Sequence, residues 1–293
     1  MTMRLEKFTN QCPVAEVSWW KYSSYLLCPQ QYNWKHISRK SAPKDSKINA
    51  VFGIIMQKLF ERWVNEERYE NTNNGIDWMR IAAENELYIL ESKERIPWGE
   101  RDIFRPAVLA DINSCIEPCI QQFIIMGWTK NTMSEVPIEA DWGNVRIGCR
   151  ADFIIQNKDG SVWIVDGKGS KSTSYTVKEQ VKWNALCYHL ATGKLPDKVG
   201  FFYWRKAKLV QVRGWGAEEE KKFCDVTRLN LNKLISGNFE AEPSENSCMW
   251  CPWRETCEQR TDMIRDYSSK DNLPSMTSTI GDGDNVESDI VAM

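Results

Sequence analysis

Two aspartates and a lysine occupy neighbouring segments of the sequence in a pattern that suits hydrolytic chemistry. Asp152 stands in GCRADFI, and Asp166 stands in WIVDGKG, two residues before Lys168. Residues two apart in a strand point to the same face, so Asp166 and Lys168 share a side, and Asp152 reaches it if a hairpin pairs the two segments. Two carboxylates in such a site attract Mg²⁺ or Mn²⁺, which neutralises a phosphate and lowers the pKa of a bound water. Lys168 would contact that water or the developing charge, although a solvent-exposed hairpin can carry the same pattern.

Three of the ten cysteines form a compact group. Cys248, Cys251 and Cys257 stand in a Cys-x2-Cys-x5-Cys run, and clustered cysteines inside a cell bind metal more often than they form disulfides. Three thiolates leave one position of a four-ligand site open. Cys28 is the best candidate for it, because its Cys-Pro step ends a helical segment. The spacing allows either an iron–sulfur centre or a structural zinc, which would join the two ends of the fold.

Hydrophobic periodicity predicts the elements that position these residues. Apolar residues recur at three- and four-residue steps over 51–68, which predicts an amphipathic helix, and the helical pattern continues over 76–127. From Glu135 onward, β-branched and aromatic runs are interrupted at 142–144 and 157–160, which predicts a three-stranded meander. The remaining predictions are a helical opening segment over 1–50, helices over 178–192 and 218–235, and strands over 198–204 and 208–212. This order predicts an α/β fold.

The composition indicates a globular protein with a buried hydrophobic core. A chain of 293 residues with 42% hydrophobic residues can bury a core, and its formal charge of −2 means that any nucleic-acid-binding surface must be local. No apolar run approaches the roughly 18 to 20 residues of a membrane span. The first residues lack the apolar stretch of a secretory signal, so we expect a cytoplasmic protein without a membrane partner. We predict one domain over 1–267 and a disordered, acidic tail over 268–293.

The segments around the proposed site carry local positive charge. Lys171, Lys182 and Arg205 lie on or beside the elements predicted to follow Asp166. They could form a local basic surface, and a solvated charged face is the alternative interpretation.

Five motifs in this order resemble the PD-(D/E)XK nucleases, and within them the RecB-like branch that carries an iron–sulfur cluster, including CRISPR-associated exonucleases. SWWKYSSYLLCPQQY resembles the segment with the first cluster cysteine, GCRADFI the strand with the first catalytic acid, and WIVDGKGS the Asp/Glu-x-Lys strand. KEQVKWNALCYHL resembles the helix that bears a glutamine, and CMWCPWRETC the segment with the last three cysteines. The resemblance spans residues 18–257. It implies a restriction-endonuclease-like core of helix, three-stranded meander, helix and strand, with a helical N-terminal part and a C-terminal iron–sulfur segment.

The resemblance also implies roles for individual residues. Asp152 and Asp166 would be ligands of Mg²⁺ or Mn²⁺, with the carbonyl of Gly167 as a possible further ligand. Lys168 would position the hydrolytic water, and Gln180 would hold that lysine or a DNA phosphate. The iron–sulfur ligands of a [4Fe–4S] cluster, with zinc as the alternative, would be Cys28, Cys248, Cys251 and Cys257.

Two positions depart from the family pattern. The family's Gly-x3-His-x3-Glu helix is matched by GIIMQKLFE, in which Gln57 replaces the histidine ligand. An amide oxygen is a poorer ligand than imidazole for Mn²⁺ but is acceptable for Mg²⁺. The family's Gln-x3-Tyr becomes Gln180-x3-Asn184, with Tyr188 one turn later on the same helix face. The resemblance implies a DNA substrate, and the candidate DNA contacts are then Lys171, Lys182, Tyr188 and Arg205.

These expectations lead to a metal-dependent DNA exonuclease that acts on ends or single strands, in recombination, repair or CRISPR adaptation. A helicase or a recombination or CRISPR-adaptation protein would be its partner. The alternative is a catalytically weak or inactive nuclease-fold subunit, because of Gln57. A third reading is a zinc-stapled interaction protein in which the Asp-x-Lys pair is accidental.

Overall fold

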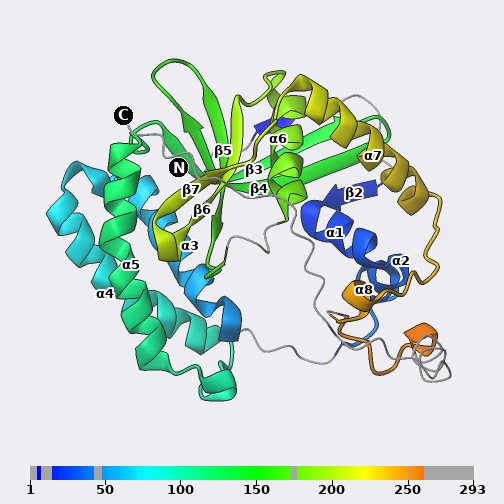
Figure 1. The fold of residues 1–293 in the computed structure, drawn as a ribbon, viewed down its shortest axis with the longest axis horizontal. Coiled ribbons are helices and arrows are strands. Elements are labelled where there is room, and N and C mark those ends of the chain that lie inside the picture. The colour runs from blue at the N-terminus through cyan, green and yellow to red at the C-terminus, as the bar shows by residue number, and fades with distance from the viewer. Residues whose placement is uncertain (1–4, 8–14, 43–47, 173–176, 250, 261–293) are drawn as a thin grey trace, which may run out of the picture. The chain divides into compact units, whose positions relative to one another are not determined.

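The computed structural model describes residues 5–7, 15–42, 48–172, 177–249 and 251–260. The chain divides into two compact units, Met1–Glu242 and Pro243–Met293. The first unit is a mixed β-sheet with helices on both faces (Figure 1). The mixed α/β class predicted from the sequence is therefore confirmed.

The described strands form one seven-stranded sheet in the order β1-β3-β4-β5-β6-β7, with β2 paired to β4 outside this path. The β3-β4-β5 meander and the β6-β7 pair are antiparallel, whereas β1 with β3, β2 with β4 and β5 with β6 are parallel. The strands are β1 (Leu5–Lys7), β2 (Ala15–Ser18), β3 (Thr132–Trp142), β4 (Val145–Gln156), β5 (Val162–Lys168), β6 (Lys198–Tyr203) and β7 (Lys208–Gln211).

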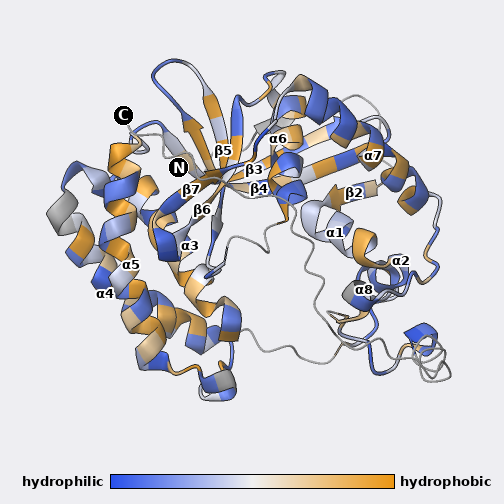
Figure 2. Cartoon of the chain, viewed as in Figure 1, coloured by the Kyte–Doolittle hydropathy of each residue, from blue (hydrophilic) through white to orange (hydrophobic). Residues whose placement is uncertain are grey.

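Helices α3 (Val51–Asn65), α4 (Thr72–Lys93) and α5 (Arg105–Ile125) form one helical layer. Apolar residues of α3 recur every three or four positions, so one face of the helix is buried against the sheet. Phe60 of α3 lies in the same core cluster as Phe123 of α5 and Phe153 of β4. Figure 2 shows that all three helices combine hydrophobic and hydrophilic residues, as helices with one buried face do.

The opposite face of the sheet packs against α6 (Lys178–Thr192), together with α7 (Ala217–Ile235) and α1 (Trp19–Leu27). Trp183 of α6 stacks on Tyr22 of α1 at 4.9 Å between ring centroids and donates a hydrogen bond to the carbonyl of Gly148 in β4. The shorter helical segments are α2 (Pro29–Tyr32), η1 (Asn33–Ile37), η2 (Ile48–Ala50), η3 (Arg68–Glu70), η4 (Glu100–Asp102) and η5 (Trp204–Lys206).

The prediction of helical structure over residues 1–50 is wrong for β1 and β2. These strands have three and four residues, too few to show a periodic pattern in the sequence. Each is held by parallel pairing with a much longer strand, which is a tertiary interaction that local periodicity does not report. The helical prediction agrees with α1 and α2 in the same region.

The second unit contains α8 (Glu245–Met249), which a pair of serines caps. The backbone N–H of Ser247 donates to Ser244 Oγ at 3.1 Å, and the N–H of Ser244 donates to Ser247 Oγ at 2.9 Å. Consecutive turns follow, in which the N–H of Cys251 donates to the carbonyl of Cys248 and the N–H of Thr256 to that of Trp253. The predicted disordered tail, residues 268–293, lies outside the described residues, and one domain over 1–267 stays a prediction.

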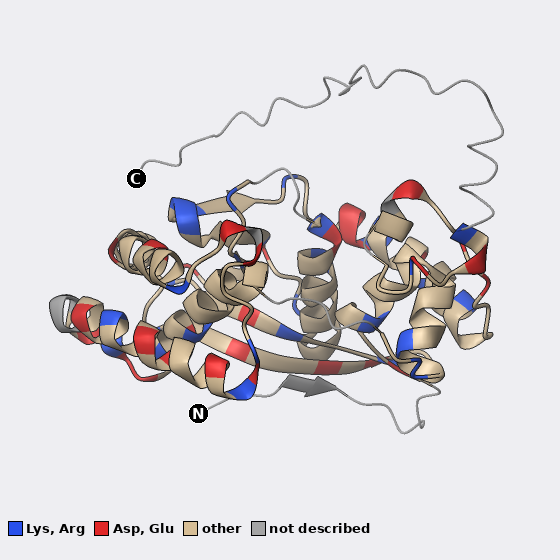
Figure 3. Cartoon of the chain, turned by 90° about the horizontal axis from the view of Figure 1, so that it is seen from below, with Lys and Arg blue, Asp and Glu red and all other residues tan. Residues whose placement is uncertain are grey.

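None of the described helices combines the length and the apolar composition that a membrane span needs. Figure 3 shows acidic and basic residues interspersed over the elements, in keeping with the formal net charge of −2.

Candidate active site

The two aspartates lie on adjacent strands at the same level of the sheet. Phe153 of β4 is opposite Val165 of β5, so the next step along each strand brings Asp152 beside Asp166. The backbone N–H of Gly167 donates a hydrogen bond of 2.8 Å to Asp152 Oδ2. The antiparallel pairing of β4 and β5 therefore brings together two acids that are 14 residues apart in the sequence.

Lys168 and Gln180 complete a hydrogen-bonded group around Asp166. Lys168 Nζ lies 2.6 Å from Asp166 Oδ2 and donates to Gln180 Oε1 at 2.7 Å. Gln180 Nε2 in turn donates to Asp166 Oδ1 at 2.8 Å. Gln180 is in the first turn of α6, which therefore holds both the lysine and the acid in place from one face of the sheet.

Gln57 approaches the site from α3, on the other face of the sheet. Its Nε2 donates to Glu135 Oε1 at 2.9 Å, while its Oε1 is buried and has no hydrogen-bond partner among the described residues. A Cβ atom added to Gly167 would lie 2.6 Å from this oxygen, so the amide oxygen is packed against the backbone between Asp166 and Lys168. A buried acceptor without a donor is costly, and a bound cation would satisfy it.

Glu135 is a further acidic residue of the site, and its backbone is strained. It faces Asp152 across the β3–β4 pair, where the regular pairing is interrupted, and its φ of 53° lies in the left-handed region. The alternation of side chains also breaks there, since Ala151 and Phe153 belong to opposite cores although they are two residues apart in β4. A strained non-glycine residue costs on the order of 1–3 kcal/mol and is typical of functional sites. The sequence offers no signal for it, because a backbone angle is not visible in residue types.

Burial raises the pKa of all three carboxyl groups. Desolvation raises the pKa of Asp152 well above its usual value, and the charge of Asp166 raises it further. Desolvation likewise raises the pKa of Asp166, against the opposing effect of Lys168, and raises that of Glu135. The site thus gathers carboxyl groups in a place where water stabilises their charged forms poorly, and a divalent cation would stabilise those charged forms.

The donor set fits a hard divalent cation. Carboxylate and amide oxygens are the ligands that Mg²⁺ prefers, and the unpartnered Gln57 Oε1 is a free acceptor beside Gly167. Within the described ranges no three His, Cys, Asp or Glu side chains converge as a metal-binding group. Asp152, Asp166 and Gln57 would supply the donors.

The raised pKa of Asp152 predicts a pH-dependent stability. Between about pH 4, where an unfolded aspartate ionises, and the higher folded pKa, the folded chain holds a proton that the unfolded chain releases, so stability falls as pH rises. Asp152→Asn removes this penalty and keeps an oxygen to accept from Gly167. In metal-free buffer we expect its melting temperature to exceed that of wild type by more at pH 8 than at pH 5, measured by differential scanning fluorimetry.

Asp159→Asn is the matched control for this measurement. Hydrogen bonds from Ser161 lower the pKa of Asp159, so its stabilising effect is already complete above about pH 5. Its melting-temperature difference from wild type should stay flat from pH 5 to pH 8. A flat difference for Asp152→Asn as well would contradict a raised pKa at Asp152. Added Mg²⁺ should stabilise wild type and Asp159→Asn, but not Asp152→Asn.

The four candidate DNA-binding residues are not gathered at one place. Lys171 lies in the loop after β5 and lines a cavity beside the site. Arg205 lines the same cavity but is paired with Asp111. Lys182 Nζ forms an ion pair of 2.6 Å with Glu219 of α7, and Tyr188 is only 4% exposed within the α6-side core. Burial leaves Tyr188 as a packing residue, away from any surface that DNA could reach.

The four cysteines predicted as cluster ligands are all of intermediate exposure. In the first unit, Cys28 separates α1 from α2, and its backbone N–H donates to the carbonyl of Ser24 at 3.2 Å. In the second unit, Cys248 lies near the C-terminus of α8, and Cys251 and Cys257 lie in the turns that follow. Their joint binding of one cluster stays a prediction.

The chain is similar to two solved structures and matches one protein family. A crystal structure of a protein from Eubacterium rectale, named as a candidate exonuclease, is similar over 87% of this chain and 93% of its own, with 8% identity and a TM-score of 0.49. The crystal structure of a protein called SSO0001 is similar over 81% of this chain and 96% of its own, with 13% identity and a TM-score of 0.32. No curated protein matches the chain. The model of the PD-(D/E)XK nuclease superfamily matches residues 16–258, which include every residue of the site described above. The chain belongs to the PD-(D/E)XK nuclease superfamily.

Proposed function

We propose that this protein is a metal-dependent deoxyribonuclease that hydrolyses phosphodiester bonds, with exonuclease action on DNA ends or single strands. The observation that carries the proposal is the group formed by Asp166, Lys168 and Gln180, next to Asp152 on the paired strand. Two acids and one oriented lysine, held from both faces of the sheet, form a site suited to attack on a phosphate. Membership of a nuclease superfamily supports phosphodiester hydrolysis as the reaction of this site.

The residues of the site have different roles in the proposed reaction. Asp152, Asp166 and the amide oxygen of Gln57 would hold Mg²⁺ or Mn²⁺, with the carbonyl of Gly167 as a further ligand. A bound ion of this kind neutralises phosphate charge and lowers the pKa of water. Lys168 keeps its ammonium group beside the acids, where it donates hydrogen bonds to the attacking water or to the charge that develops on phosphate oxygens. Gln180 fixes the lysine, so that little reorganisation is needed when the substrate arrives.

A catalytically weak DNA-binding subunit is the second candidate, and one observation favours it. Gln57 stands where the resembling family has a histidine, and its Nε2 is engaged with Glu135. In this candidate the protein serves a helicase or a recombination complex, and cleavage belongs to its partner. A role in recombination, repair or CRISPR adaptation belongs to the first candidate.

A single assay separates the two candidates. End-labelled linear single-stranded DNA, blunt duplex DNA and circular single-stranded DNA are incubated with the protein and either Mg²⁺ or Mn²⁺. The proposal expects progressive shortening of the linear strands and an intact circle. Cleavage of the circular DNA would indicate an endonuclease instead of an exonuclease. If no substrate is cleaved with either metal, the catalytically weak subunit is favoured.

We further propose that Cys28, Cys248, Cys251 and Cys257 bind one [4Fe–4S] cluster of structural role, with zinc as the alternative metal. Each of the four cysteines is only partly buried, and thiolates are the ligands that such clusters use. Replacement of any one of them by serine should lower both the iron content and the melting temperature of anaerobically purified protein. The buried Cys187→Ser is the control, and it should keep the iron of wild type. Full iron content in Cys28→Ser would exclude Cys28 as a ligand, and zinc without visible absorption would exclude the cluster.

A further inference from the structure

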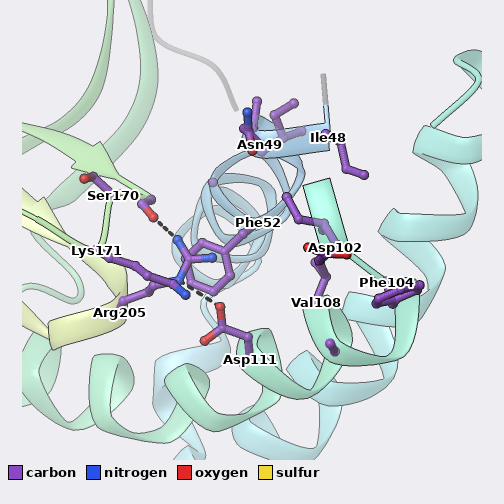
Figure 4. A pocket seen from close by; sticks show the side chains of 16 residues that line it. Ile48, Asn49, Phe52, Asp102, Phe104, Val108, Asp111, Ser170, Lys171 and Arg205 are labelled. Atoms are coloured by element: carbon purple, nitrogen blue, oxygen red, sulfur yellow. Dashed lines mark hydrogen bonds and ion pairs between the residues drawn. The ribbon is translucent and has the colours of Figure 1, made fainter. Parts of the chain in front are cut away.

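A cavity of about 900 Å³ lies next to the candidate active site within the first unit. Its walls come from the loop after β5, from the start of α3 and from the segment that leads into α5. Figure 4 shows Lys171 and Arg205 on one side of the cavity, and Asp102, Val108 and Phe104 on the other. Cavities of roughly 300–1,000 Å³ are the size that takes small organic molecules, so a nucleotide fits this one.

The cavity continues directly from the catalytic motif. Gly169 follows Lys168 in the chain and lines the cavity together with Gly53 of α3. A Cβ atom on Gly169 would lie 2.9 Å from the Cα of Gly53, so the two backbones are in close contact. Gly53 is one helical turn before Gln57. A strand whose phosphate lies at the acids would therefore place its neighbouring nucleotide at the mouth of this cavity.

The charges inside the cavity are balanced, which disfavours a phosphate there. Arg205 Nε donates to Asp111 Oδ2 at 2.8 Å, its Nη1 donates to the carbonyl of Gly169, and its guanidinium lies 3.6 Å above the ring of Phe52. Arg205 is thus fully engaged within the protein. Asp102 adds a second carboxylate opposite Lys171. Two acids and two bases leave no excess of positive charge to hold an anion in the interior.

The apolar surface of the cavity instead suits an uncharged aromatic group. Phe104 precedes the first turn of α5 and is 54% exposed, so a large part of its ring is open to contact. Val108 of α5 and Phe52 of α3 extend this apolar wall. Stacking of a base on an aromatic side chain contributes about 1–3 kcal/mol and does not depend on sequence.

We propose that this cavity takes the unpaired base of the nucleotide next to the scissile phosphate, with the base stacked on Phe104 and with Lys171 near the flanking phosphate. The inference rests on the proposed nuclease function and deepens it, because a base inside duplex DNA cannot enter such a cavity. The substrate class is then single-stranded DNA or a frayed end.

The test compares Phe104→Ala with Phe104→Tyr, which keeps an aromatic ring. Affinity for a short fluorescent single strand is measured by anisotropy with Mg²⁺ in the Lys168→Ala background, so that binding is read without cleavage. We expect Phe104→Ala to raise Kd about 5- to 150-fold, as loss of one stacking contact predicts, and Phe104→Tyr to stay near the parent. Tyr88→Ala is the control, since Tyr88 is 69% exposed on α4 and does not line the cavity.

A second arm places an abasic nucleotide at successive positions along the strand. One position should weaken binding to the parent by a similar factor, and Phe104→Ala should be insensitive to the same lesion. Equal affinities of Phe104→Ala and the parent, or equal sensitivity of both to the lesion, would overturn the inference. Cleavage by the wild-type protein is measured separately. If wild type cleaves DNA but binding does not depend on Phe104, only the proposal for the cavity is contradicted. If binding depends on Phe104 but wild type does not cleave DNA, only the nuclease function is contradicted.

Discussion

Lys168→Ala and Asp166→Ala should each lower DNA cleavage by about 10³-fold or more, at saturating Mg²⁺ or Mn²⁺. Removal of a single preorganised donor at a reacting centre typically costs 10²–10³-fold, and loss of Asp166 removes a metal ligand as well. Lys168 and Asp166 also contact each other and Gln180, so their effects should not add in the double variant. Single-turnover cleavage of a labelled single strand measures the loss.

Lys158→Ala is the control for removal of a positive charge. Lys158 is exposed in the turn between β4 and β5, six residues after Asp152. This variant should cleave DNA like wild type, and all three variants should melt cooperatively. Cleavage by Lys168→Ala at a rate near that of wild type would exclude Lys168 from the chemistry.

Gly167→Ala should destabilise the fold and disable the site together. A Cβ atom at this position would lie 2.5 Å from Trp204 Cζ2 and 2.6 Å from Gln57 Oε1. Trp204 is 1% exposed and packs against Phe60, so it has no room to move. Overpacking of this kind costs about 1–3 kcal/mol, which corresponds to a loss of about 2–12 °C in Tm for a chain of this size. The displaced strand end would also weaken the hydrogen bond from Gly167 to Asp152.

Gly53→Ala is the matched control, because the same substitution meets a different environment one turn from Gln57. Its Cβ atom would lie 3.6 Å from Gly169 Cα, an ordinary contact. Alanine is favoured over glycine in a helix by about 1 kcal/mol, so this variant should be as stable as wild type or more stable. A drop in Tm for Gly53→Ala equal to that of Gly167→Ala would show that the region tolerates no side chain at all, and would remove the specific role of Trp204.

Local sequence patterns were sufficient to predict the elements that carry the candidate catalytic residues. The helix predicted over 178–192 coincides with α6, and the turn residues at 142–144 and 157–160 separate β3, β4 and β5. Apolar periodicity and turn chemistry are properties of neighbouring residues, so the sequence reports them well. The strands β1 and β2 were not predicted, because their stability comes from partners more than 100 residues away.

Individual side chains were harder to predict because their surroundings come from distant elements. Lys182 was expected to face DNA, but α7 provides Glu219 as its partner. Tyr188 shares a helix face with Gln180 in the sequence, yet the packing of α6 on the sheet buries it. Glu135 was not among the predicted site residues, since its place in the site depends on a left-handed backbone and on the amide of Gln57.

Gln57 and Gln180 reach the acids from helices on opposite faces of the sheet, and this has a consequence for biosynthesis. A chain leaves the ribosome from its N-terminus, so α3 is available before β4 and β5, and α6 only after them. Until α6 docks, Lys168 lacks the amide oxygen that orients it, and Asp166 lacks the amide that donates to it. A nascent chain that ends before residue 180 therefore holds the two aspartates without an ordered lysine. The hydrogen-bonded arrangement of Asp166, Lys168 and Gln180 therefore forms late in synthesis, when most of the first unit has already left the ribosome.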